Sequence, residues 1–158
     1  MWYTTTLHWQ LDFNPAITNL EEIRTLRTLL GQDLRELKET DPVADGLQRK
    51  LNESVSKDSK FKSINLSYID FELTSKLDWI QWDWSEKFYD IVEKTQFIID
   101  YMRHYYPHFG LSGSIECQWE EFEDRWLLVV KDNIATRVDN QLVWYVRCPE
   151  CDHHFKIN

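Results

Sequence analysis

The end of the chain carries the residues best suited to metal chemistry. Cys148 and Cys151 are separated by two residues, a spacing whose turn lets two thiolates bind one zinc ion at about 2.3 Å. His153 or His154 would supply a third ligand. No second Cys-x-x-Cys pair occurs in the sequence, so a fourth ligand must come from elsewhere in the chain or from a second subunit. The candidates in the chain are His8, His104, His108 and Cys117. A tail with free thiols and a thioredoxin-type redox pair are the alternatives.

A run of carboxylates forms a second candidate site. It comprises Glu116, Glu120, Glu121, Glu123 and Asp124, and Asp70, Glu72, Asp78, Asp83 and Glu86 could extend it. Carboxylate oxygens suit a divalent cation, although the run lacks the spacing of a calcium loop. A solvated hairpin tip is the simplest interpretation. The third interpretation is that the carboxylates imitate a row of phosphates and bind the basic groove of a nuclease or polymerase.

Three tryptophans lie close together in the segment that precedes the second long helical pattern. They are Trp79, Trp82 and Trp84, and Asp78 and Asp83 lie among them. One interpretation is a loop folded back over a sheet, with the rings as its core. The other is that one or two rings are exposed, and exposed aromatic rings beside acids are typical of binding hot spots.

The sequence contains none of the common catalytic signatures. It has no Gly-rich phosphate loop, no Gly-x-Ser-x-Gly elbow and no His-Glu-x-x-His pair. Acyl transfer, nucleotide hydrolysis and metalloprotease chemistry therefore lack support. We expect a protein that is not an enzyme.

The charge distribution limits the kinds of partner that the protein is expected to bind. Residues 64–124 hold thirteen acids and four lysines and arginines. The net charge of this segment, −9, therefore equals the net charge of the whole chain. An acidic surface repels nucleic acid and attracts basic proteins, so direct DNA or RNA binding is not expected. No apolar run reaches the ~20 residues that cross a bilayer, and no signal peptide pattern opens the chain. Three cysteines, an odd number, favour a reducing cytoplasmic setting.

Hydrophobic periodicity predicts the elements that position these residues. Alternation over 3–13 predicts a strand, and spacings of three and four after a capping box at Thr18 and Glu21 predict a helix that Gly31 ends or kinks. Residues 43–62 read as a loop or a short exposed helix.

The second half of the chain is predicted to be mostly strands. A strand over 64–73 with a bulge precedes a helix that starts after Ser85 and runs to about Tyr106. Strands follow at 111–120, 126–131, 134–138 and 142–146, the first two as a hairpin and Asp132-Asn133 as a tight turn.

The expected fold class is α+β. We expect a mixed or mainly antiparallel sheet of five to six strands with two main helices packed on one face. Residues 1–147 would form one domain, and 148–158 would be a C-terminal tail.

Two segments resemble a group of small phage and bacterial proteins of unknown function. The first is the Gly-containing strand at 111–121 together with Asp124-Arg125-Trp126 and the Val-rich strand up to Asn133. The second is Trp82-Asp83-x-Ser85-Glu86-Lys87-Phe88-Tyr89. Trp119 and Trp84 stand where those proteins tend to have Gly. The resemblance implies an association with phage or mobile-element genes and no particular activity.

These observations lead to one leading hypothesis and two alternatives. The leading one is an acidic, phage-encoded interaction protein that binds and inhibits a basic host protein, such as a defence nuclease of the CRISPR type, in the host cytoplasm. The first alternative is a small zinc-stabilised enzyme or regulator that uses the C-terminal cysteines. The second is a structural or assembly protein that oligomerises.

Overall fold

The computed structural model describes residues 10–56, 66–83, 90–118, 125–139, 144–147 and 154–157; for the last two segments, and for residues 55, 56, 118 and 125, only the backbone is described. The fold is α+β, as predicted. The helices are α1 (Leu20–Leu30), α2 (Leu34–Thr40), α3 (Pro42–Ser56) and α4 (Ile91–Tyr105). The strands are β1 (Gln10–Phe13), β2 (Phe71–Leu73), β3 (Trp79–Trp82), β4 (Leu111–Gln118), β5 (Arg125–Lys131), β6 (Ile134–Asp139), β7 (Trp144–Arg147) and β8 (His154–Ile157).

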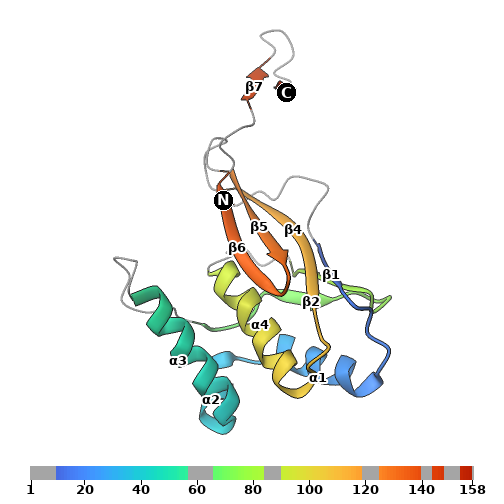
Figure 1. Ribbon diagram of the computed structural model, residues 1–158, viewed down its shortest axis with the longest axis vertical. Helices are drawn as coiled ribbons and strands as arrows, with labels where there is room; N and C mark the ends of the chain where they lie inside the picture. The colour runs from blue at the N-terminus through green and yellow to red at the C-terminus, as the bar shows by residue number, and fades with distance from the viewer. Residues whose placement is uncertain are drawn as a thin grey trace.

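Six strands form one sheet in the order β2-β3-β1-β4-β5-β6, and every neighbouring pair is antiparallel. The sheet joins the two halves of the chain through β1, which pairs with β3 on one side and β4 on the other (Figure 1). β2 and β6 are its edges.

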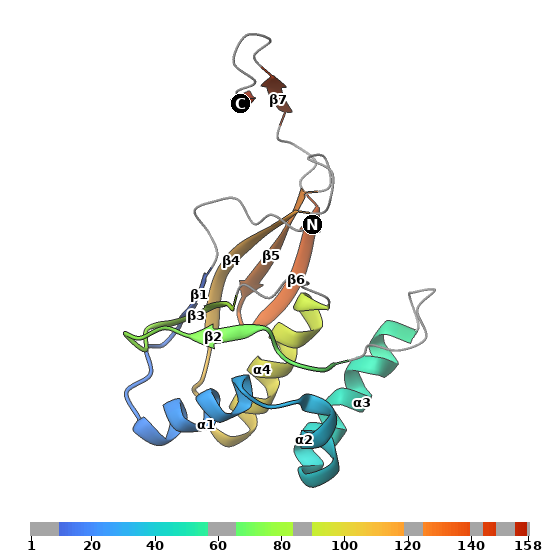
Figure 2. The same ribbon diagram turned by 180° about the vertical axis from the view of Figure 1, so that it is seen from behind.

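One face of the sheet forms the core with the helices. Leu11, Ile80, Ile115 and Leu128 come from four different strands, share this face and are wholly buried. The helices lie together on one side of the strands (Figure 2). Helix α4 is central because its buried side chains Phe97, Ile98 and Met102 face both the sheet and the neighbouring helices.

The first predicted helix is two helices. Its chain turns at Gly31, whose N–H bonds the carbonyls of Arg27 and Thr28, and restarts after Asp33, whose carboxylate accepts from Arg35 N–H. The cap is one residue later than predicted: Asn19, not Thr18, accepts from Glu21 N–H. Of the two outcomes predicted at Gly31, an end of the helix or a kink, the structure shows the end.

Two further helices differ in extent from the predictions. Residues 43–62 were predicted as a loop or a short exposed helix, and the described part of this segment belongs to α3, which has fifteen residues. Asp41 caps it by accepting from Val43 N–H at 2.8 Å. The predicted helix from Ser85 is described only from Ile91, after Asp90 in a left-handed conformation. The described residues thus contain four helices.

The segment around the tryptophans is a strand rather than the predicted loop. Trp79–Trp82 forms β3, in the interior of the sheet. Its neighbour β2 is shorter than the predicted strand over 64–73, because Asp70 adopts a positive φ of 63° that interrupts extended structure. Tyr68 is exposed and Ile69 buried, so the predicted change of apolar phase is real, although it lies before the strand.

The two hairpins of the second half are confirmed. Gln118 pairs with Arg125, and Lys131 pairs with Ile134 across the turn Asp132-Asn133, whose φ values of 52° and 61° suit a type I′ hairpin turn. Among the described residues, no helix is both long and apolar enough to span a membrane.

The last predicted strand does not join the main sheet. β7 pairs with β8 as a separate two-stranded ladder, in which Arg147 is the partner of His154. Figure 1 shows β7 apart from the strands of the main sheet. The boundary predicted between residues 147 and 148 therefore falls inside a hairpin. A continuous apolar run over 142–146 predicted this strand, but such a run carries no information on which strand a segment pairs with.

Candidate functional site

The sheet face opposite the helices carries a tryptophan flanked by carboxylates. The register pairs Trp79 with Asp12 and Gln81 with Glu72, and paired residues in a sheet point to the same side. Ile80 lies between Trp79 and Gln81 and points into the core. Asp12, Glu72, Trp79 and Gln81 therefore share the outer side, and we call this group the acidic strip.

Hydrogen bonds connect the members of the acidic strip. Trp79 Nε1–H donates to Gln81 Oε1 at 3.3 Å, and Gln81 Nε2–H donates to Glu72 Oε1 at 2.7 Å. Gln10 donates to Asp12 Oδ1 at 3.0 Å. These donors are neutral amides and an indole, so the contacts orient the two carboxylates without neutralising their charge. Asp12 and Glu72 are exposed, and the Trp79 ring is half-buried.

The three tryptophans do not form one surface. Trp82 pairs with the buried Phe71, so it points to the helix side of the sheet while Trp79 points away. Trp84 lies outside the described residues. The period of two in β3 separates the first two rings, and only Trp79 belongs to the acidic strip.

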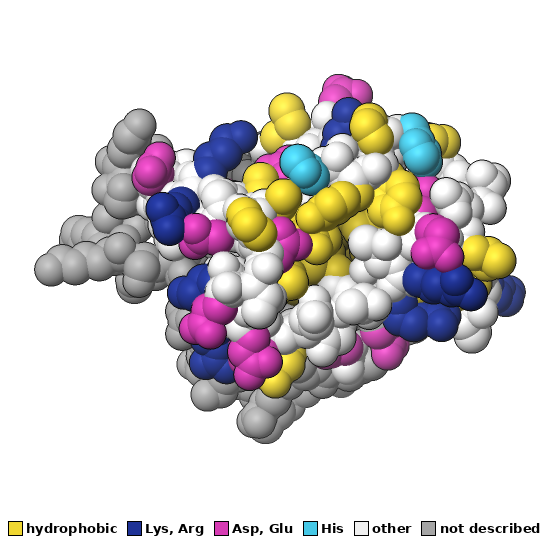
Figure 3. Space-filling model, turned by 90° about the horizontal axis from the view of Figure 1, so that it is seen from below, with side chains coloured by type: hydrophobic (Ala, Val, Ile, Leu, Met, Phe, Trp, Pro, Cys, Tyr) yellow, Lys and Arg dark blue, Asp and Glu magenta, His cyan; other side chains and the backbone are white. Residues whose placement is uncertain are grey.

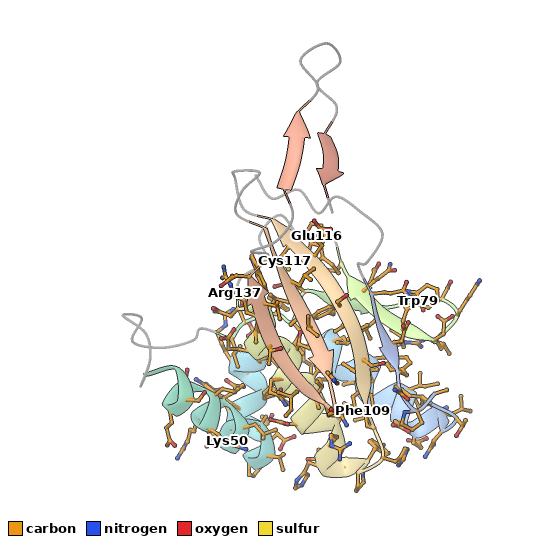
Figure 4. All side chains as sticks on the ribbon, turned by 45° about the horizontal axis from the view of Figure 1, so that its top comes forward. Lys50, Trp79, Phe109, Glu116, Cys117 and Arg137 are labelled. Carbon is orange, nitrogen blue, oxygen red and sulfur yellow. The ribbon has the colours of Figure 1, made fainter. Side chains whose placement is uncertain are left out.

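Glu116 lies on the outer face but at a distance from Trp79. It is paired with Leu127 on β5, four residues along β4 from Ser112, the partner of Asp12. At about 3.4 Å per residue this offset is about 14 Å along the strand. Figure 4 shows Trp79 on β3 and Glu116 on β4, well separated from one another. The other predicted hairpin carboxylates lie outside the described residues: Glu120, Glu121, Glu123 and Asp124.

Only some of the five acids predicted to extend the acidic row lie near the acidic strip. Glu72 belongs to the acidic strip. Asp78 accepts from Thr74 Oγ1 at 2.8 Å in the turn before β3, and exposed Asp83 follows β3. Asp70, however, forms an ion pair with Lys94 of α4, whose side chain is 3% exposed. Asp70 therefore serves the contact between sheet and helix, and Glu86 lies outside the described residues.

The helical side of the molecule has a different electrostatic character. Ion pairs neutralise several of its acids: Glu21 with Arg24, Asp33 with Arg35 and Asp45 with Arg49. Figure 3, which views the end of the molecule where the helices lie, shows acidic and basic side chains interspersed around a hydrophobic patch. Among the described residues, the acids of the helices named above are ion-paired, whereas no described lysine or arginine pairs with Asp12 or Glu72 of the acidic strip.

The side chains of the predicted metal ligands at the end of the chain are not among those that the structure describes. Cys148, Cys151 and His153 lie outside the described residues, and of His154 only the backbone is described, at the start of β8. Cys117 is engaged elsewhere: it is buried on the helix side of β4, and burial raises the pKa of its thiol to about 12. The described part of the chain holds no group of three or more His, Cys, Asp or Glu residues arranged to bind a metal ion.

The two histidines whose side chains are described make contacts within the fold. His104 lies edge-on to the Tyr105 ring, with centroids 4.9 Å apart. His108 Nε2 lies 2.9 Å from Glu22 Oε2, and the Glu22 side chain is only 1% exposed. Among described residues, the other Glu22 oxygen has no hydrogen-bond partner. Removal of His108 would therefore leave a buried carboxylate without a described partner.

Sequence reasoning missed the charged cluster at the start of α4. Burial raises the pKa of Asp90 and of Glu93, and both lie close to the ion pair between Lys94 and Asp70. A signal was available, because Lys94 occupies the apolar stripe between Ile91 and Ile98. A lysine at such a position requires a buried carboxylate partner.

Comparisons with known protein families, with curated proteins and with solved structures gave no match for this chain.

Proposed function

We propose that this chain is a non-enzymatic protein that binds a basic surface of another protein through the acidic strip. The observation that carries the proposal is the register of β1, β2 and β3 on the sheet face opposite the helices. It places Trp79 opposite Asp12, and it places Glu72 opposite Gln81, two residues along β3 from Trp79. Their hydrogen-bond donors are neutral, so the negative charge remains available to a partner.

The two kinds of side chain have separate roles in this interaction. The carboxylates attract a basic protein at long range and raise its association rate, an effect that salt weakens. The Trp79 ring supplies contact area and a face on which an arginine guanidinium can stack. Tryptophan is enriched among residues whose loss costs about 2 kcal/mol or more of binding free energy.

The chemistry of the partner follows from that of the acidic strip. A protein groove that binds nucleic acid is lined by lysine and arginine, and carboxylates can occupy it in place of phosphates. Together with the resemblance to phage proteins, this favours a phage-encoded inhibitor of a defence nuclease, with a CRISPR effector as the first target to test. Such a protein would act in the host cytoplasm.

The proposal is tested by capture of basic proteins from a bacterial lysate, followed by nuclease assays with each purified partner. The variant D12K/E72K reverses two charges of the acidic strip, and E36K/E39K makes the same change in charge at two exposed positions of α2. We expect D12K/E72K to lose capture and inhibition, and E36K/E39K to keep both. Equal behaviour of the two variants would reject the acidic strip as the binding surface.

A zinc-stabilised regulator remains the second candidate, because of the pairing of β7 with β8. An isolated two-stranded hairpin is marginally stable in water and usually needs a cross-link or a partner. Arg147 pairs with His154, so the connection between these strands is the segment that contains Cys148 and Cys151. Metal analysis of the purified chain and of C148S/C151S tests this candidate. Zinc in the first sample and none in the second would support it, and a zinc-free first sample would reject it.

A further inference from the structure

The edge strand β6 has two parts that differ in the hydrogen bonds of their outward-facing backbone groups. At its start, Gln96 of α4 acts in place of a neighbouring strand. Its Oε1 accepts from Ala135 N–H at 2.9 Å, and its Nε2–H donates to the carbonyl of Asn133 at 3.2 Å. Ala135 N–H therefore points away from β5, toward the edge of the sheet.

The direction of the backbone groups at the other residues of β6 follows from that of Ala135. In an antiparallel strand every second residue directs its N–H and C=O to the same side, so Arg137 and Asp139 share the outward direction of Ala135. Val138 directs its backbone inward to Leu127 of β5. Within the part of the chain that the structure describes, no other strand pairs with this edge. An edge of this kind is a template for a further strand.

We propose that β6 pairs antiparallel with β6 of a second copy of this chain, about a two-fold axis through Val138. In this register Arg137 of each copy lies opposite Asp139 of the other, and the two residues exchange the outward backbone hydrogen bonds. Val138 lies opposite its own counterpart. The sequence Arg-Val-Asp is thus complementary to itself in charge, as an interface between identical subunits requires.

The side chains of β6 suit this pairing. Arg137 and Asp139 are 54% and 63% exposed and already form an ion pair within the strand. The guanidinium also lies over the Trp126 ring, 4.7 Å from its centroid. Val138 and Ile134 are 45% and 58% exposed, on the same outer side as the half-buried Leu127. Pairing would cover this aliphatic surface.

The charge of the molecule permits this contact. Like charges oppose self-association, but residues 125–139 hold three lysines and arginines against two acids, so the acidic excess lies elsewhere. Such an axis is perpendicular to the joined sheet, so the acidic strips of both copies would face the same side. The dimer would then offer two binding surfaces to one partner or to two adjacent ones. This inference stands apart from the proposed function, because β6 lies at the opposite edge of the sheet from β2.

Light scattering after size-exclusion chromatography of the full chain tests the proposal. The expected mass is twice the chain mass of 19.2 kDa. R137D and D139R each place like charges opposite one another, so each should weaken dimerisation at least tenfold. R137D/D139R exchanges the two charges and should restore the dimer. V138K should dissociate it, whereas L20K, the same kind of change at an exposed position of α1, should not. Circular dichroism shows that each variant is folded.

A chain that stays monomeric at all concentrations would overturn the proposal, and it would indicate that another part of the same chain covers the edge. A dimer that tolerates each single charge reversal would overturn this pairing, as would a double variant that fails to regain the dimer. The acidic-strip variant D12K/E72K should remain dimeric. Loss of capture in that variant with an unchanged mass separates the two proposals.

Discussion

Trp79 and Trp82 lie three residues apart on β3 and face opposite sides of the sheet. Trp79 is the partner of Asp12 on the outer face, and Trp82 is the partner of Phe71 on the face that packs on the helices. Under the proposed function, the Trp79 ring contributes to binding, whereas the Trp82 ring on the helix side contributes to stability.

The two tryptophans should respond differently to truncation. Trp82→Ala removes a ring from the helix side, so the free energy of unfolding should fall by about 2 to 3 kcal/mol. Trp79→Ala removes a half-exposed ring and should cost about 1 kcal/mol or less. Urea unfolding followed by circular dichroism measures both. Equal losses would contradict the assignment of the rings to opposite faces.

The ion pair between Lys94 and Asp70 should be sensitive to the loss of one partner. Asp70→Asn removes the charge and keeps a residue that tolerates the positive φ at this position, so it isolates the electrostatic effect. Because Lys94 is 3% exposed, we expect a loss of about 3 kcal/mol in unfolding free energy. D70N/K94M should cost less than the sum of the single changes. Strict additivity would show that the two groups are not coupled.

The stability of the fold should depend on pH through Glu93. Burial raises the pKa of Glu93 above its ordinary value of 4.5, so the folded state disfavours the carboxylate. Below pH 4.5 the group is protonated in both states and has no effect, and the cost appears as the pH rises through the folded pKa. Glu93→Gln should therefore stabilise the protein at pH 7 and have little effect at pH 4. Denaturant unfolding at both pH values measures this.

Asp41 is expected to show the opposite behaviour. Burial would raise the pKa of Asp41, but hydrogen bonds from the Tyr101 hydroxyl and from Val43 N–H outweigh it and hold the pKa below 3.8. Its contribution to stability is present above pH 3.8 and is lost as the pH falls through the folded pKa. Asp41→Asn should thus destabilise the protein at pH 7, and the difference should shrink in acid. An effect that grew in acid would contradict this assignment.

Cys117 should be unreactive in the folded protein. Burial raises the pKa of its thiol to about 12, so almost no thiolate forms at pH 8. Iodoacetamide labelling followed by peptide mass spectrometry should leave Cys117 unmodified in native protein and modify it in urea. Rapid modification of the native protein would contradict its burial.

Much of the fold could be predicted from the sequence because its local signals are strong. Alternation in β4, the apolar run of β5 and the Asp132-Asn133 turn predicted the meander, and the α+β class followed. The errors occurred where local and tertiary signals compete. β3 was missed because a Trp-rich segment without alternating polarity resembles a loop, although the sheet satisfies its backbone between β2 and β1.

The candidate site was predicted less well than the fold. Glu72 and Trp79 were identified from composition, but Asp12 was not, since its proximity to Trp79 depends on the pairing of β1 with β3. Asp70 was assigned to the exposed acidic row although it lies within the strand predicted over 64–73. Its ion pair with Lys94 depends on a contact between segments 24 residues apart. Strand register and sheet order are long-range properties that periodicity does not encode.

The most direct test of the binding face places a photoreactive benzoylphenylalanine at a single position and identifies the cross-linked partner by mass spectrometry. Position 79 lies in the acidic strip, and position 20, exposed on α1, serves as the control. If the acidic strip is the binding surface, irradiation should link the captured protein to position 79 through a lysine- and arginine-rich peptide and leave position 20 unlinked. Equal cross-linking at both positions, or cross-linking at position 20 alone, would contradict the account.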